Sequence, residues 1–346
     1  MKKLFIAALA LATVACTKSE VLETAPQKAI SFGNPFVENA TKAIDPSLTH
    51  GTEGTFTSFN VYGTLSNGTA TTNIFNGVEV VKVSDATHTI GATGTWYYNS
   101  SSVQYWIPGN TYNFVAVANA TKVNVDAANN NMPTTLEYTA DGKTDLLYTK
   151  TPVTKTPDVA SFDETVAFTF DHLLSKVKFT FINGYPADSK LVVEVSDVKI
   201  INAYTSGVCT LTGEEAPTWG SFGTADKKIE FGNIVQNGTD YSEAVYSMPA
   251  TGALSGTDWT TKDGFSSNYE RLLIPGQSEF NVTFTAKVLL NGIVVNSYSG
   301  STVTVQGGLQ PGYSYNFVGT IGQNLEKITF SVEKINGFTP VTPEDE

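Results

Sequence analysis

The feature of this sequence that most restricts its fold is an octet that occurs twice. Residues 108–115 read Pro-Gly-Asn-Thr-Tyr-Asn-Phe-Val and residues 311–318 read Pro-Gly-Tyr-Ser-Tyr-Asn-Phe-Val, identical at six of eight positions. Pro followed by Gly is typical of a type II turn, because proline presets a negative φ and glycine accepts a positive one. Polar and apolar residues alternate behind each turn, as in a strand. The repetition favours two related β domains over a chance match.

Composition and length agree with this interpretation. The chain has 346 residues and only 16% charged side chains, with many Thr, Gly, Asn, Val, Tyr and Phe residues. Such a composition favours strands and turns over helices, and the length favours two domains. The net charge of −12 argues against nucleic acid or anionic lipid headgroups as electrostatic partners.

The first residues predict export and a lipid anchor. Two lysines precede a short apolar run, which is typical of a signal peptide and too short to span a bilayer. The run ends at Cys16, and the residues before it resemble a bacterial lipobox, with Thr13 where leucine is usual. We therefore predict a lipoprotein signal peptide at residues 1–15, lipidation of Cys16 and a tether at residues 16–28. A lipidated Cys16 leaves Cys209 without a disulfide partner, so Cys209 is predicted to be a buried thiol.

The remaining chain predicts an all-β protein of two antiparallel β-sandwich domains. The first domain is expected at residues 29–157 and the second at residues 158–346, joined by a Thr-, Lys- and Pro-containing linker at residues 149–163. Residues 166–170 are expected to open the second domain. The clearest strand is residues 280–290, where alternate positions are apolar, and Asn-Gly after it predicts a type I′ hairpin turn.

Signatures of catalysis are missing from the sequence. The histidines, His50, His88 and His172, stand apart from one another and from metal-ligand patterns, and we expect His172 to be a packed structural residue. The sequence has no phosphate-binding loop, nucleophile elbow or zinc signature. Glycosidase carboxylates need no local signature, so this absence alone does not exclude an enzyme. We predict a non-enzymatic protein without a cofactor.

A cluster of aromatic residues leaves one alternative open. Its five rings could form a platform on which sugars stack, although in a β-rich chain such rings more often belong to the core. The cluster comprises Trp96, Tyr97, Tyr98, Tyr105 and Trp106.

Several motifs, taken in their order along the chain, resemble the fimbrillin family of Bacteroidales surface lipoproteins, the type V pilins and their relatives. They are the lipobox-like Cys16, Thr-Lys-Ala at residues 41–43, Tyr-Trp-Ile-Pro-Gly at 105–109 leading to Tyr-Asn-Phe, Phe-Asp-His-Leu-Leu-Ser-Lys-Val at 170–177, and Leu-Gln-Pro-Gly at 309–312. The resemblance spans almost the whole chain. It implies two transthyretin-like sandwiches and a lipoprotein exported to the outer membrane.

The resemblance also implies a mode of assembly, in which a protease removes the first strand and a strand of another subunit fills the groove. Mapped onto this sequence, the removable strand carries Ile30 and Phe32, and processing falls between Lys42 and Ala43. Family members often carry Arg at that point, whereas the only arginine here is Arg271. An Arg-specific protease could therefore not cut at Lys42. The candidate donor strand carries Ile328, Phe330 and Val332.

The predicted function is thus a structural subunit of a surface fimbria, with other fimbrial subunits and the outer membrane as partners. Whether it is a stalk, tip or anchor subunit stays open. The alternative is a monomeric surface lipoprotein that binds glycans, or other host or bacterial surface molecules, through the aromatic cluster.

Overall fold

The computed structural model describes residues 28–33, 36–37, 57–91, 96–149, 153–157, 165–211, 216–236, 244–250, 265–267, 269–322, 328 and 330–335. Cys16, Lys42 and Ala43 lie outside them. Within these ranges the regular elements are strands and three one-turn 3₁₀ helices, so the predicted all-β class is confirmed. No helix in this part of the chain is long and apolar enough to cross a membrane.

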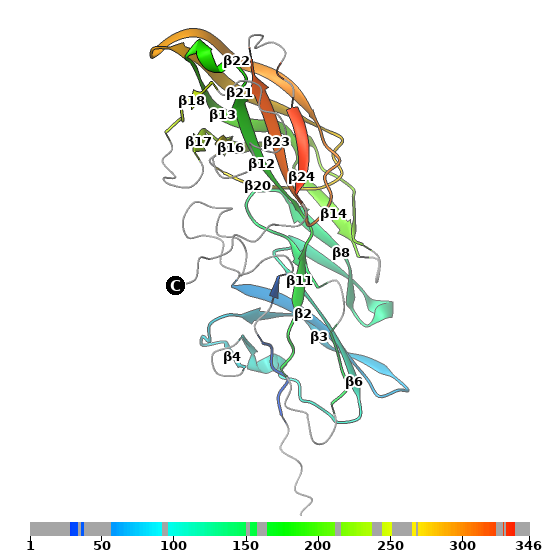
Figure 1. Ribbon diagram of the computed structural model, residues 1–346. Coiled ribbons are helices and arrows are strands. Elements are labelled where there is room, and N and C mark those ends of the chain that lie inside the picture. Colours follow the sequence, from blue (N-terminus) through cyan, green and yellow to red (C-terminus); the bar gives the residue numbers. More distant parts are fainter. Residues whose placement is uncertain are drawn as a thin grey trace, which may run out of the picture.

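The largest sheet lies at the lower end of the molecule in Figure 1. Its strand order is β1-β11-β9-β6-β2-β3-β5-β4, and β10 also pairs with β6. The first octet supplies its turn and strand β6, with Gly109 at φ 82° as the turn requires. The strands are β1 (Phe36–Val37), β2 (Ser58–Ser66), β3 (Thr71–Val81), β4 (His88–Ile90), β5 (Tyr97–Asn99), β6 (Thr111–Ala118), β9 (Leu147–Tyr148), β10 (Val153–Lys155) and β11 (Thr169–His172).

Two further sheets form the upper end and share a hydrophobic core. One has the order β17-β19-β12-β23-β24, with β20 on β12, and the other has the order β16-β13-β21-β22, with β18 on β13. The rings of Phe181 on β12 and Phe284 on β21 contact across the core, with centroids 5.0 Å apart. The strands are β12 (Ser175–Asn183), β13 (Leu191–Tyr204), β16 (Ala225–Gly232), β17 (Ile234–Gln236), β18 (Met248–Pro249), β19 (Phe265–Ser267), β20 (Arg271–Leu273), β21 (Glu279–Leu290), β22 (Ile293–Gln306), β23 (Ser314–Ile321) and β24 (Phe330–Ile335).

A smaller sheet connects the two ends. It has the order β15-β14-β8-β7, with β7 (Lys122–Asp126), β8 (Met132–Thr139), β14 (Ser206–Thr210) and β15 (Thr218–Gly220). Strand β8 precedes the predicted linker and strand β14 follows it, yet the two are paired over five residues from Ser206↔Thr139 to Thr210↔Thr135. Backbone hydrogen bonds therefore join the two ends.

The two octets play equivalent structural roles. Tyr112 and Phe114 are buried in the first hydrophobic cluster, and Tyr315 and Phe317 in the second. In both copies the residue before the proline donates its backbone N–H to the tyrosine hydroxyl, from Ile107 to Tyr112 at 2.7 Å and from Gln310 to Tyr315 at 2.9 Å. In each octet the tyrosine hydroxyl thus connects the Pro-Gly turn to the strand that follows it by a hydrogen bond.

The hydrophobic clusters divide the chain later than the sequence prediction did. Val166, Phe168 and Phe170 were expected to open the second domain, but they are buried in the first cluster. They belong there because their segment runs parallel to the first strand, with Val166 bridged to Phe32. The predicted linker contains strand β10, which pairs with β6. In this part of the chain the change of cluster falls instead between Leu174 and Val177, and the first cluster also includes the later residues Cys209, Leu272 and Ile274.

Candidate functional site

The first strand lies between two other segments of the chain. On one side it runs antiparallel to residues 104–106, where the Ile30 N–H donates to the Gln104 carbonyl at 2.8 Å and the Trp106 N–H donates to the Lys28 carbonyl at 3.0 Å. Residues 28–33 therefore form ladder hydrogen bonds with a segment more than seventy positions later in the sequence.

On its other side the strand runs parallel to residues 165–166. The Val166 N–H donates to the Ser31 carbonyl at 2.8 Å, and the Gly33 N–H donates to the Val166 carbonyl at 2.8 Å. The parallel pairing continues in β1, where Phe36 pairs with Thr169 and Val37 with Phe170. The strand is thus inserted into the first half of the protein, with partners on both edges.

The side chains of Ile30 and Phe32 are both completely buried. They are two positions apart, so in an extended strand they point to the same face. The Phe32 ring contacts four other rings, with centroid distances of 5.5 Å to Phe75, 5.5 Å to Tyr98, 6.3 Å to Phe114 and 5.9 Å to Phe168. At about 1.5–3 kcal/mol for each large apolar side chain, burying both contributes roughly 3–6 kcal/mol.

Two residues, Tyr98 and Gly63, accommodate the first strand. The buried Tyr98 hydroxyl donates to the Ile30 carbonyl at 2.8 Å, and its burial raises the pKa of that phenol. On β2, a Cβ at Gly63 would lie 2.8 Å from the Phe114 ring and 3.2 Å from the Phe75 ring. Glycine at this position therefore leaves the space in which both rings pack.

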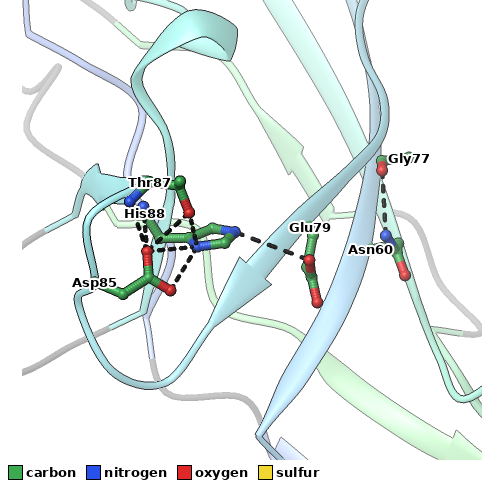
Figure 2. Close-up of polar contacts among 6 residues, drawn as sticks. All are labelled: Asn60, Gly77, Glu79, Asp85, Thr87 and His88. Atoms are coloured by element: carbon green, nitrogen blue, oxygen red, sulfur yellow. Dashed lines mark hydrogen bonds and ion pairs between the residues drawn. The ribbon is translucent and has the colours of Figure 1, made fainter.

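A polar turn supports the strand that carries Tyr98. The backbone N–H groups of Thr87 and His88 donate to Asp85 Oδ1 at 2.7 and 2.8 Å. These two bonds, of which the Thr87 bond has the larger effect, hold the pKa of Asp85 well below its usual range. The His88 ring lies between Asp85, 2.9 Å from its Nδ1, and Glu79, 3.8 Å from its Nε2 (Figure 2). The turn leads into β4, which pairs with β5 and its Tyr98.

Without the first strand this region would be a groove able to bind another extended chain. Its edges would present the Gln104 carbonyl, the Trp106 N–H and both backbone groups of Val166. Its floor would present the rings that now surround Phe32. Such a site binds a strand through main-chain hydrogen bonds and selects alternate side chains through pockets.

The aromatic cluster mostly belongs to the core. Trp96, Tyr98 and Trp106 are at most 4% exposed, which leaves no open ring faces for a sugar. Trp96 packs on Phe59, with centroids 5.1 Å apart. Of the other two rings, Tyr97 is partly buried and Tyr105 is 40% exposed. The stacking platform considered from the sequence is therefore not formed by the three buried rings.

The candidate donor strand is already part of the second core. Strand β24 pairs antiparallel with β23 from Ser314↔Ile335 to Gly319↔Phe330, at the end of its sheet. Ile328 is buried, and the Phe330 ring lies 5.5 Å from Phe181 and 5.8 Å from Phe179. Val332 is partly buried on the same side.

Two further residues are buried as the sequence predicted. His172 is 7% exposed and its Nδ1 contacts the carboxylate of Asp145, a partner that the sequence reasoning missed because it lies 27 positions away. Cys209 is a free, buried thiol, and its burial raises its pKa to about 12. Among the described residues, no three His, Cys, Asp or Glu side chains gather in a metal-binding arrangement.

One comparison with known proteins identifies the family of this chain. The sequence profile of the fimbrillin-like family matches residues 41–334. A fimbrial protein from Bacteroides vulgatus shares the fold at a TM-score of 0.56 and 16% identity, over 90% of this chain and 99% of that one. A candidate cell adhesion protein from Bacteroides uniformis aligns at a TM-score of 0.45 and 16% identity, over 89% of this chain and 98% of the other. No curated protein matches the sequence significantly. Since the family profile covers most of its length, this chain belongs to the fimbrillin-like family.

Proposed function

We propose that this chain is a structural, non-enzymatic subunit of a surface fimbria, made as a lipid-anchored outer-membrane precursor and assembled by strand exchange. The observation that carries the proposal is the first strand, which is hydrogen-bonded on both edges and completely buried at Ile30 and Phe32. A strand held in this way can be replaced only by another strand that fills the same positions.

Membership of the fimbrillin-like family supports the same role, because it places the chain among proteins of the cell surface and of fimbriae. The partners are then other fimbrial subunits. Lipidation at Cys16 and cleavage between Lys42 and Ala43 complete the proposal: the anchor holds the precursor at the outer membrane, and the cut releases the first strand from the remaining chain.

The donor in this proposal is β24, through Ile328, Phe330 and Val332. Because Phe330 packs in the core of its own subunit, β24 has to leave that core before it can enter the groove of the next subunit. Polymerisation should then be slow, and faster under conditions that loosen the second half of the protein.

A single cut tests the proposal. The chain has one arginine, Arg271, which is 6% exposed. In residues 16–346, here called the exported chain, with the substitutions Cys16→Ala and Lys42→Arg, an Arg-specific protease should therefore cut after position 42, because Arg271 is buried. The matched control is the same chain with Lys42 retained, treated with the same protease.

Size-exclusion chromatography then gives the outcome. We expect the cut Lys42→Arg chain to form a ladder of polymers and the control to stay monomeric. A peptide of residues 28–37 added in excess should slow polymerisation, because it competes for the groove. A cut chain that stays a folded monomer at high concentration would reject strand exchange, and its retention on a polysaccharide column would favour the glycan-binding alternative.

A further inference from the structure

Exposed apolar side chains gather at the tip of the β21–β22 hairpin. Ile293, Val294 and Val295 are 70%, 49% and 53% exposed, and Leu290 across the turn is 37% exposed. We name these four residues the tip patch. Strand β22 is the last strand of its sheet, so within the described residues no further strand pairs with its outer edge.

A β-bulge lies within the tip patch. Val294 pairs with Leu289 and Asn296 pairs with Val288, which leaves Val295 as an extra residue in β22. The bulge interrupts the alternation between the core face and the solvent face. Residues 290–297 are all exposed, so the apolar residues of the tip patch do not fill the core of their own subunit.

A second exposed apolar site lies beside the first-strand groove. Tyr105 is 40% exposed and Ile107 is 54% exposed, and we name this pair the base patch. Between them, Trp106 is bonded to the first strand through the Lys28 carbonyl. The base patch is thus continuous with the groove proposed to receive the strand of another subunit.

Strand β22, which carries most of the tip patch, lies at the upper end of the elongated molecule in Figure 1, and β6, which follows the base patch, lies at the lower end. In the upper half, Thr205 follows the last residue of β13, and its carbonyl accepts a hydrogen bond from Ala140 of the first half. Leu290 pairs with the first residue of β13, at the end of that strand farthest from this junction. In the lower half, the last residue of β6, Ala118, pairs with β9 near the junction. The first residue of β6 lies at the opposite end of the strand and follows the base patch in the sequence.

The sequence segments that carry the two patches contain no charged residue, although the whole chain carries −12. Residues 86–121 and residues 288–325 contain no Asp, Glu, Lys or Arg. By contrast β16, at the opposite edge of the same sheet as β22, carries Asp226, Lys227, Lys228 and Glu230. Charges are the usual protection of an exposed edge strand, and β22 lacks them.

We propose that the tip patch of one copy packs on the base patch of the next copy, as a second contact beside the exchanged strand. The proposal rests on the proposed function, since strand exchange brings the groove of one copy to another. A contact between two different patches at opposite ends propagates into an open filament, whereas a symmetric tip-to-tip contact would stop at a dimer. The contact also joins two segments without charged side chains, which lowers the repulsion between copies that carry the same negative charge.

Cross-linking tests the contact directly. In the exported chain with Cys16→Ala, the buried Cys209 is shielded, so new cysteines are the reactive thiols of the described residues. We expect a mixture of Ile107→Cys and Val294→Cys chains, cut at position 42 and mildly oxidised, to form disulfide-linked pairs. Each variant alone should not. The control mixture replaces Val294→Cys with Lys228→Cys, on the opposite sheet edge.

Two results would overturn the inference. One is a polymer in which the Ile107→Cys and Val294→Cys mixture gives no more cross-linking than the control mixture. The other is Val294→Cys alone giving as much cross-linked product as the mixture, which would indicate a tip-to-tip contact.

A charge substitution separates this inference from the strand-exchange proposal. Val294→Lys in the cut Lys42→Arg chain should lower the polymer yield at limiting concentration by at least about tenfold, because a charge replaces a valine that the proposed contact buries. Val83→Lys is the matched control, since Val83 is 73% exposed and outside both patches. Equal polymer from Val294→Lys and Val83→Lys would reject the tip contact and keep strand exchange. Cross-linking without any polymer would keep the contact and reject strand exchange.

Discussion

The ring of Phe32 stacks on the ring of Phe168, with centroids 5.9 Å apart and planes 21° from parallel. Phe32 belongs to the first strand, and Phe168 follows Val166, to which that strand is bridged. The same two segments are thus joined by backbone hydrogen bonds at their edges and by stacking at their faces. Loss of the first strand removes both kinds of contact at once.

We therefore expect Phe32→Ala to lower the free energy of unfolding by about 3–5 kcal/mol, the usual range for a buried phenylalanine. Urea unfolding of the uncut exported chain with Cys16→Ala measures this change. Val83→Ala, which truncates an exposed apolar side chain, should stay within about 0.5 kcal/mol of the parent. A loss below about 1 kcal/mol for Phe32→Ala would show that the first strand stabilises the precursor little.

The hydroxyl of Tyr98 should control how readily the first strand opens. Tyr98→Phe removes the donor to the Ile30 carbonyl, and a lost hydrogen bond of this kind costs about 0.5–1.5 kcal/mol. Hydrogen exchange at the Ile30 amide should then be roughly 2- to 13-fold faster, as measured by mass spectrometry of the first-strand peptide. Tyr105→Phe is the control. Equal exchange in both variants would mean that this bond does not limit opening.

The two halves should stay together when the chain is cut in the linker predicted from the sequence. Strands β8 and β14 are paired, and the first cluster contains Leu272 and Ile274 from late in the chain. After cleavage at a protease site inserted between Val159 and Ala160, both fragments should co-elute in buffer and separate in urea. Separation in buffer alone would instead show two independent domains, as the sequence interpretation expected.

The alternation of apolar residues predicted strands but could not assign them to a core. Residues 166–170 alternate as a strand would in either half, and only their pairing with the distant first strand places them in the first cluster. The Asn-Gly turn was predictable because its requirement is local: Asn291 and Gly292 have φ of 53° and 80°, as a type I′ turn needs.

The site shows the same division between local and distant information. Burial of Ile30 and Phe32 followed from their spacing, whereas the rings around Phe32 come from four separate segments. A run of aromatic residues like that around Trp96 occurs both in hydrophobic cores and on sugar-binding surfaces. Only the exposed fractions of the side chains in the structure distinguish the two. The hydrogen bond from the Ile107 N–H to the Tyr112 hydroxyl has an equivalent in the second octet, but no sequence pattern predicts it.

The thiol of Cys209 should be unreactive in the native protein. Burial raises its pKa to about 12, so almost none is thiolate at pH 8. A folded-state pKa above the unfolded value stabilises the protein below the unfolded pKa of about 8.5, and that contribution is lost as the pH rises toward 12. A thiol reagent at pH 8 should label the Cys16→Ala chain only after denaturant is added. Rapid labelling without denaturant would show that the site opens.

The last prediction concerns β24, which is held to β23 by pairs that include Val318↔Ser331. Residues directly opposite each other in an antiparallel pair are close enough for a disulfide. In the Lys42→Arg chain with Cys16→Ala, the added pair Val318→Cys and Ser331→Cys should therefore lock β24 to its own subunit. We expect the oxidised, cut protein to remain monomeric and to polymerise once a reductant is added, while each single cysteine variant polymerises under both conditions. If the locked protein forms the same polymers as the unlocked one, β24 stays in place during assembly and another segment of the chain is the donor.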